Sequence, residues 1–181
     1  MHRQSLLSLL HQYNPIDPAE RSMWLNTITF VETNPDCFER SLAIGHVTGS
    51  AWIVSPDRQQ VVLIHHRKLD RWFQPGGHAD GNPDVAAVAM QEAQEETGLT
   101  RLRFAHSFTE EPPIFDLDVH LIPARGSDLT HYHYDIRFLL EADPDEAFVE
   151  SGETKAIRWV QLTDVDRFTE EISIRRMTGK L

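Results

Sequence analysis

The chain has 181 residues, of which 40% are hydrophobic and 25% are charged, as in an ordinary globular domain with a buried core. Its formal net charge of −11 disfavours duplex nucleic acid and anionic membranes as partners, because both carry charge of the same sign. The single cysteine, Cys37, excludes an intrachain disulfide and a thiolate zinc cluster, and it fits a reducing, cytoplasmic setting.

The first part of the chain predicts two helices. Leucines recur through "SLLSLLHQY" until an Asn-Pro pair ends the pattern. In "DPAE", Asp17 can cap a second helix, Pro18 suits its first position, and Glu20 can complete a capping box. We expect residues 1–44 to form an N-terminal helical extension. Three roles are open for it: covering a pocket, forming a homodimer or enlarging the fold.

From residue 45 onward the sequence predicts strands and helices in mixed order. The expected elements are a hairpin (46–54 and 61–66), a Pro/Gly-rich loop (71–81), a helix (83–97), strands (114–123, 131–142 and 154–162) and one or two closing helices (163–177). None of these segments has the roughly 18 consecutive apolar residues that span a bilayer, so we expect no membrane partner.

The helix expected at 83–97 has a defined start and a defined end. Asn82 can act as its N-cap, Pro83 suits the first helical position, and Gly98 suits the position just after the last turn. Alanines at 86, 89 and 93 share one side, so the helix can lie close against a sheet.

Three glutamates, Glu92, Glu95 and Glu96, fall within roughly a quarter-turn of one another beside that packing side. Carboxylates three and four residues apart on a helix repel by about 0.2–0.5 kcal/mol per pair. One interpretation is a solvated acidic face. The other is a site for Mg²⁺ or Mn²⁺, because carboxylate oxygens are hard ligands and the preceding Gly-Gly pair lets the backbone approach a ligand.

The segment "GGHADGNPDVAAVAMQEAQEETGL" resembles the Nudix box, in which a glycine, a glutamate and an Arg-Glu-x-x-Glu-Glu-x-Gly motif stand at fixed spacing. The matching positions are Gly77, Glu92, Glu95, Glu96, Gly98 and Leu99. "WFQPGG" and "IRWVQL" also resemble the family, so the resemblance covers roughly residues 45–165. It implies an α/β fold, an α/β/α sandwich with a mixed sheet, in which residues 45–181 are the catalytic domain.

The same resemblance implies an activity and a cofactor. The activity is hydrolysis of a nucleoside diphosphate linked to another moiety, or of a related small-molecule diphosphate, with Mg²⁺ or Mn²⁺ as cofactor. It makes Glu92 and Glu96 the principal metal ligands and Glu95 a ligand or a water-orienting base. It makes the backbone carbonyl of Gly76 a further ligand. A general base from a distant loop is also implied, for which the candidates are Glu150 and Glu153.

Two positions depart from the Nudix pattern. Pro83 stands where the family has its first glutamate, and Gln91 stands where it has arginine. We favour an active enzyme because all three carboxylates on the helix are present. The alternative is a catalytically silent Nudix-fold module that senses a ligand or binds a partner. A diphosphate isomerase is disfavoured because no cysteine lies near the expected site.

Histidines form a second candidate site. His131, His133 and Asp135 share one face of the strand expected at 131–142, and Asp118 and His120 alternate in the same way. If these strands pair, the imidazoles and carboxylates could bind a transition metal, a phosphate or part of the substrate. The alternative is a polar strand face that is hydrogen-bonded within itself.

Further candidate substrate-binding residues lie close to the glycine-rich loop. His66, Arg67 and Arg71 come at the end of a strand that enters the loop, where cationic groups could bind substrate phosphates. A solvated strand end is the alternative interpretation. His78 follows the Gly-Gly pair directly, so its backbone borders the expected cation site.

Overall fold

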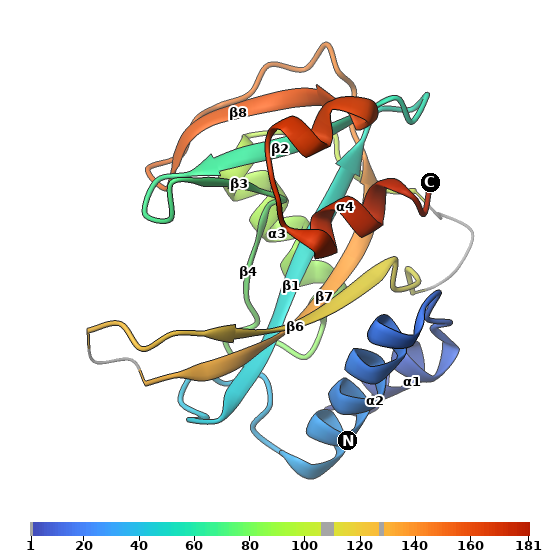
Figure 1. The fold of residues 1–181 in the computed structure, drawn as a ribbon, viewed down its shortest axis with the longest axis vertical. Helices are drawn as coiled ribbons and strands as arrows, with labels where there is room; N and C mark the ends of the chain where they lie inside the picture. The colour runs from blue at the N-terminus through green and yellow to red at the C-terminus, as the bar shows by residue number, and fades with distance from the viewer. Residues whose placement is uncertain (1, 106–110, 127–128) are drawn as a thin grey trace.

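A mixed sheet organises the chain (Figure 1). The computed structural model describes residues 2–105, 111–126 and 129–181, and within them eight strands form one sheet in the order β3-β2-β1-β7-β5, with β4 on β1, β6 on β7 and β8 on β2. The strands are β1 (Gly45–Val54), β2 (Gln60–His66), β3 (Arg71–Phe73), β4 (Gly76–His78), β5 (Arg103–Phe104), β6 (Asp116–Ile122), β7 (His131–Glu141) and β8 (Thr154–Gln161). The predicted α/β fold with a mixed sheet is confirmed.

Strand β1 lies at the centre of this sheet and is buried along its whole length. It runs parallel to β7, and antiparallel to β2 and β4. The pairing of Val54 with Val61 forms the predicted hairpin. Because side chains alternate along a strand, β1 sends Val47 and Ala51 into one hydrophobic cluster and Trp52 into another on the opposite face.

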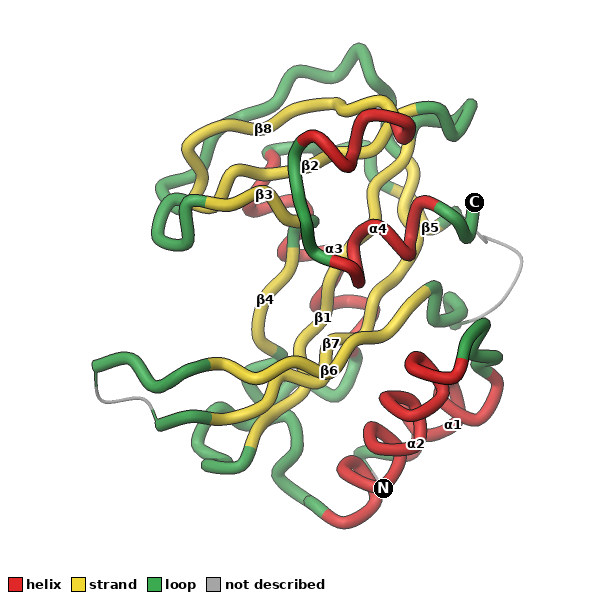
Figure 2. The backbone as a smooth tube through the Cα atoms, in the orientation of Figure 1, coloured by secondary structure: helices red, strands yellow, loops and turns green. Residues whose placement is uncertain are grey.

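Helices cover both faces of the sheet (Figure 2). Those that contribute to the larger cluster are α1 (Gln4–Gln12), α2 (Pro18–Thr33) and α3 (Val85–Thr97). On the opposite face lie the 3₁₀ helix η1 (Leu162–Arg167) and α4 (Ile172–Thr178), which form the predicted pair of closing helices. Among the described residues, no helix combines the length and the apolar character needed to cross a membrane.

Two local predictions around the glycine-rich segment were wrong. The segment 71–81 is not all loop, because β3 and β4 form within it by pairing with β2 and β1. Helix α3 begins at Val85 rather than at Pro83, because Asp84 is the N-cap and accepts a hydrogen bond from the Ala87 N–H at 3.0 Å. The predicted end is confirmed: Gly98 adopts the left-handed conformation, with φ of 73°.

The start of α2 follows the prediction in part. Asp17 caps the helix and accepts a hydrogen bond from the Glu20 N–H at 2.8 Å. The Glu20 carboxylate, however, accepts from the Ile16 N–H rather than completing a capping box with Asp17. It is fully buried and also bonds to Tyr13 and Lys180, which draw it away from the helix start. These contacts tie α2 to the C-terminal end of the chain.

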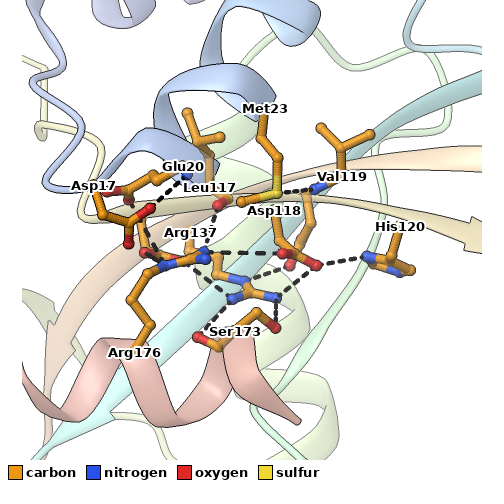
Figure 3. A network of polar contacts seen from close by, with 12 residues as sticks. Asp17, Glu20, Met23, Leu117, Asp118, Val119, His120, Arg137, Ser173 and Arg176 are labelled. Carbon is orange, nitrogen blue, oxygen red and sulfur yellow. Dashed lines mark hydrogen bonds and ion pairs between the residues drawn. The ribbon is translucent and has the colours of Figure 1, made fainter.

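A network of buried charges centres on Arg137 (Figure 3). This residue is 2% exposed, and its guanidinium donates to Asp135 at 2.7 Å, to Asp116 at 3.1 Å and to both oxygens of Ser173. Arg176 also donates to Asp116, at 2.8 Å. Burial opposes the charged form, but the neighbouring aspartates raise the pKa of Arg137, so the guanidinium stays charged. The network therefore joins β7, β6 and α4.

Replacing Arg137 should be strongly destabilising. We expect Arg137→Met to lower the free energy of unfolding by about 3–5 kcal/mol, because it deprives two buried carboxylates of a charged partner. Urea denaturation at neutral pH measures this change. Arg103→Met is a matched control, since Arg103 forms an exposed pair with Glu141 at 2.8 Å and its loss should cost less than about 1 kcal/mol. Equal losses in the two variants would contradict the prediction.

Candidate functional site

The acidic end of α3 lies against β4. Glu96 is 6% exposed, and its carboxylate accepts a hydrogen bond from the Gly76 N–H at 2.9 Å. A side chain at Gly77 would collide with the Glu92 carboxylate. Gly77 therefore lets the backbone of β4 pass directly beside Glu92, whereas a Cβ at Gly76 would instead meet Ser50 of β1.

Helix α3 comes close to the sheet because the residues that face it are small. Ala86, Ala89 and Ala93 are all buried. On β1, a Cβ at Gly49 would lie 2.8 Å from the carbonyl oxygen of Val85. The close approach predicted from the spacing of alanines is confirmed, and it brings the glutamates of α3 to the edge of β4.

Negative charge accumulates at this position. Burial raises the pKa of Glu96 to about 7; the Gly76 N–H opposes this shift, and the charges of Glu92 and Glu153 add to it. Burial also raises the pKa of Glu92, with further contributions from Glu95 and Glu153. Four carboxylates thus share one electrostatic environment, and a bound cation would stabilise their ionised forms.

The two departures from the box pattern have local substitutes. At the arginine position, the side-chain amide of Gln91 donates to Glu95 Oε1 at 2.8 Å, and Glu95 itself is exposed. At the front of the helix, Pro83 lies outside α3, and Asn82 Oδ1 accepts from the Asp84 N–H at 3.0 Å. The helix start is therefore held by side-chain caps without a glutamate at position 83.

The loop between β7 and β8 carries both candidates for a distant base. Glu150 and Glu153 are both exposed, but it is the charge of Glu153 that raises the pKa values of Glu92 and Glu96. Arg67 shapes this loop: its backbone N–H donates to the Glu153 carbonyl at 2.8 Å, and its guanidinium donates to the carbonyls of residues 152 and 154. Sequence reasoning did not anticipate this positioning role.

The other basic candidates at the strand end have partners within the protein. His66 Nδ1 accepts from the backbone N–H groups of Lys68 and Leu69 at 3.2 and 3.3 Å, and burial lowers the pKa of this imidazole. Arg71 pairs with Glu171 at 2.9 Å on the surface. A role for these residues in substrate binding stays a prediction.

The histidine candidates form a separate cluster. They are His131 and His133 on β7, His120 on β6 and His78 on β4. The ring centroid of His133 lies 5.0–5.5 Å from those of the other three. His46 on β1, which sequence reasoning missed, lies opposite His133 in the parallel pairing. The alternation of side chains along β1 predicts which face of the sheet His46 occupies. It does not predict that His133 lies beside it.

The two aspartates grouped with these histidines have other partners. Asp135 accepts hydrogen bonds from Thr48 at 2.9 Å, from Ser50 at 2.7 Å and from Arg137. These contacts make Asp135 part of the buried network, and its expected contribution to a metal or phosphate site stays a prediction. Asp118 lies 3.0 Å from His120 Nδ1 and orients that ring.

A cavity of about 730 Å³ lies elsewhere, between α1 and the C-terminal segment. Its lining includes Leu9, Tyr13, Phe115 and Lys180, and it contains neither the glutamates of α3 nor the clustered histidines. The acidic site, formed by Glu92, Glu95 and Glu96 beside β4, is thus separate from this cavity.

Comparisons of the sequence with known proteins point to one family. The family model described as "NUDIX domain" matches residues 46–180. A CMP-5'-(N-acetyl-N-hydroxy-3-aminopropyl)phosphonate hydrolase from Streptomyces rubellomurinus is 36% identical over 88 residues, which cover 45% of this chain and 43% of that protein. A putative 8-oxo-dGTP diphosphatase from Bacillus subtilis is 24% identical over 115 residues, covering 64% and 66%. The matches therefore span less than two thirds of either relative.

Solved structures share the fold. An Ap4A hydrolase of C. elegans in a binary complex matches with a TM-score of 0.57 and 16% identity, covering 74% of this chain and 93% of that one. The E. coli dihydroneopterin triphosphate pyrophosphohydrolase matches with a TM-score of 0.57 and 18% identity, covering 75% and 93%. At these identities the likeness concerns the fold.

Replacing Glu96 tests the cost of burying its carboxylate. Between its ordinary pKa of 4.5 and about 7, the folded state holds a proton that the unfolded state has lost, so wild-type stability falls as pH rises through this window. At pH 8 in EDTA, we expect Glu96→Gln to exceed wild type in free energy of unfolding by on the order of 1–3 kcal/mol, and by less at pH 5. Urea denaturation at both pH values measures the difference. The exposed Glu95→Gln is the control, and a Glu96→Gln effect that did not change with pH would contradict the prediction.

Proposed function

The chain belongs to the Nudix hydrolase family, and from this premise we propose that it hydrolyses a P–O–P linkage in a nucleoside diphosphate derivative with the help of Mg²⁺ or Mn²⁺. One observation carries the proposal: Glu92 and Glu96 converge, partly or fully buried, on the two glycines of β4. Such a cluster is costly for a folded protein alone, and it suits a cation that binds phosphate oxygens.

The residues present fit a hard divalent cation. Carboxylate oxygens of Glu92, Glu95 and Glu96 and the backbone carbonyl of Gly76 would hold it, and oxygen donors are the ligands that Mg²⁺ and Mn²⁺ prefer. The raised pKa of Glu96 supports this fit, because a cation would restore the ionised ligand at neutral pH. When bound, the cation supplies positive charge to the diphosphate oxygens and lowers the pKa of a water molecule.

The remaining roles belong to backbone and side-chain groups of the chain itself. The Gly76 N–H orients Glu96, and the amide of Gln91 orients Glu95. We assign Glu153 as the group that takes a proton from the attacking water, because its charge acts on Glu92 and Glu96 from a separate loop. Arg67 is the positioning residue that holds this loop.

The names of the relatives support a nucleotide-derived substrate. One relative is named as a hydrolase of a CMP-linked phosphonate, another as a putative 8-oxo-dGTP diphosphatase, and a structural neighbour as an Ap4A hydrolase. We therefore propose a nucleoside monophosphate joined through a P–O–P bridge to a second phosphoryl or phosphonyl group.

The N-terminal helices support the catalytic domain in this proposal. We assign residues 45–181 as the catalytic domain and residues 1–44 as a helical extension that enlarges its core. Leu6, Leu10 and Phe30 of α1 and α2 belong to the same hydrophobic cluster as the alanines of α3. This shared core favours enlargement of the fold over a freely moving cover.

Steady-state hydrolysis of a panel of nucleoside diphosphate derivatives tests the catalytic assignment. We expect release of a nucleoside monophosphate with Mg²⁺ or Mn²⁺ and none in EDTA. Glu153→Gln should lower kcat by about 10²–10⁴-fold, the usual contribution of a general base, and Glu96→Gln by at least as much. Glu150→Gln is the matched control from the same loop and should leave kcat unchanged.

Two outcomes would argue against this assignment. Turnover that survives both Glu92→Gln and Glu96→Gln would contradict the site itself. Absence of turnover on every compound, with Mn²⁺ binding demonstrated, would instead favour the silent ligand-sensing module.

Gly77→Ala tests the close approach at the same site. Because a Cβ at position 77 would collide with the Glu92 carboxylate, we expect Mn²⁺ binding to weaken by about tenfold or more, as when a group that orients a ligand is lost. Equilibrium dialysis with Mn²⁺ measures this. Gly152→Ala, whose Cβ would meet open space, is the control. Equal Mn²⁺ affinity in the two variants would contradict the role of Gly77.

A further inference from the structure

Five histidines gather on the face of the sheet opposite to α3. They come from four neighbouring strands, β4, β1, β7 and β6, whose order is visible in Figure 1. His46 and His120 both lie directly opposite His133 in the strand pairing. Gly49 of β1 faces α3, so the alternating residue His46 faces the other way, and the cluster is distinct from the acidic site.

The ring nitrogens of three of these histidines converge. His131 Nε2 and His133 Nε2 lie 3.3 Å apart, and one nitrogen from each of His46, His131 and His133 lies within 4.8 Å of the others. Two nitrogens bound at about 2.0–2.1 Å to one tetrahedral ion are separated by about 3.3 Å. From this geometry we propose that His46, His131 and His133 bind a first-row transition metal ion of the Zn²⁺ class.

Hydrogen bonds around the cluster fix the rings as they do around metal ligands. His131 Nδ1 lies 2.7 Å from the Leu129 carbonyl oxygen, which makes Nδ1 the protonated nitrogen and leaves the Nε2 lone pair directed at His133. Metal-bound histidines typically donate their second nitrogen to a carbonyl or carboxylate in this way. Asp118 holds the flanking His120 through the same kind of contact, at 3.0 Å.

His46 supplies an independent observation. It is 3% exposed, and among the described residues neither of its ring nitrogens has a hydrogen-bond partner. Buried polar groups are almost always satisfied, and an unsatisfied one is destabilising. A metal ion between His46, His131 and His133 would satisfy one of these nitrogens.

The donor set favours a cation over an anion, because the Nε2 atoms of His131 and His133 face each other at 3.3 Å and the Nδ1 proton of His131 is already donated to the Leu129 carbonyl. Neutral imidazoles offer lone pairs to a metal but no positive charge to a phosphate. Three imidazoles with a fourth position left for water or a flanking histidine match a common type of zinc site.

Titration of the full-length protein with Zn²⁺ tests the site. The protein is stripped with EDTA, dialysed, and kept in excess Mg²⁺ so that the acidic site is already filled. We expect calorimetry to give one Zn²⁺ per chain, and we expect Co²⁺ to give the visible absorption of a low-coordinate ion. His131→Ala and His133→Ala should each weaken Zn²⁺ binding by more than about 100-fold, beyond the loss of an outer-sphere partner.

Controls separate this site from the hydrolase site and from general histidine binding. His11→Ala removes an exposed histidine of α1 and should bind Zn²⁺ as wild type does. Glu92→Gln/Glu96→Gln should also keep one Zn²⁺, so the result is independent of the proposed hydrolytic function. Zn²⁺ should raise the melting temperature of wild type but not of His131→Ala, which checks folding and binding together.

Three results would overturn the proposal. The first is a folded wild-type protein that binds no Zn²⁺ at micromolar concentration. The second is unchanged Zn²⁺ affinity in both His131→Ala and His133→Ala. The third is loss of the bound Zn²⁺ in Glu92→Gln/Glu96→Gln, which would assign the ion to the acidic site.

Discussion

The alternation of side chains along β1 divides this protein into two chemical environments. Because β1 is buried over its whole length and pairs with β2, β4 and β7, both of its faces must be covered. On one face Gly49 admits α3 and brings the glutamates to β4. On the other face His46 joins the imidazoles of β7, and Thr48 and Ser50 bind Asp135. A shift of one residue in the pairing of β1 would exchange these faces and destroy both arrangements.

Among the described residues, buried charge has opposite consequences around Arg137 and at the acidic site. Around Arg137 each buried carboxylate has a cationic partner, and the hydrogen bonds and charges of Arg176 and Arg137 outweigh burial and lower the pKa of Asp116. At the acidic site burial prevails, and the pKa of Glu96 rises instead. The first pattern is what a stable core requires, because an unpaired buried charge is strongly destabilising. The second is tolerated where a bound ion completes the site, and shifted pKa values are typical of functional groups.

Whether a prediction is correct depends mainly on how far apart in the sequence the interacting residues lie. Helix α3, its left-handed end at Gly98 and the common side of its three glutamates follow from spacings within one helix, and they were predictable. The start of the same helix was misplaced, because Asn82, Pro83 and Asp84 offer two competing caps and side-chain bonding selects Asp84. The sequence pattern predicts a local capping box for Glu20, whereas Lys180, far along the chain, binds its carboxylate.

The sequence by itself determined the family, the α/β class and the acidic motif on α3, because each depends on residues close together in the chain. It could not decide which loop glutamate lies near the motif, that Arg67 holds that loop, that Asp135 belongs to a buried network, or that His46 completes a histidine cluster. Those outcomes depend on which strands pair and in what register, most of all the parallel pairing that sets His46 beside His133. Such pairing is decided by the packing of the whole sheet, since a strand's own pattern shows which face a side chain occupies but not which strand lies beside it.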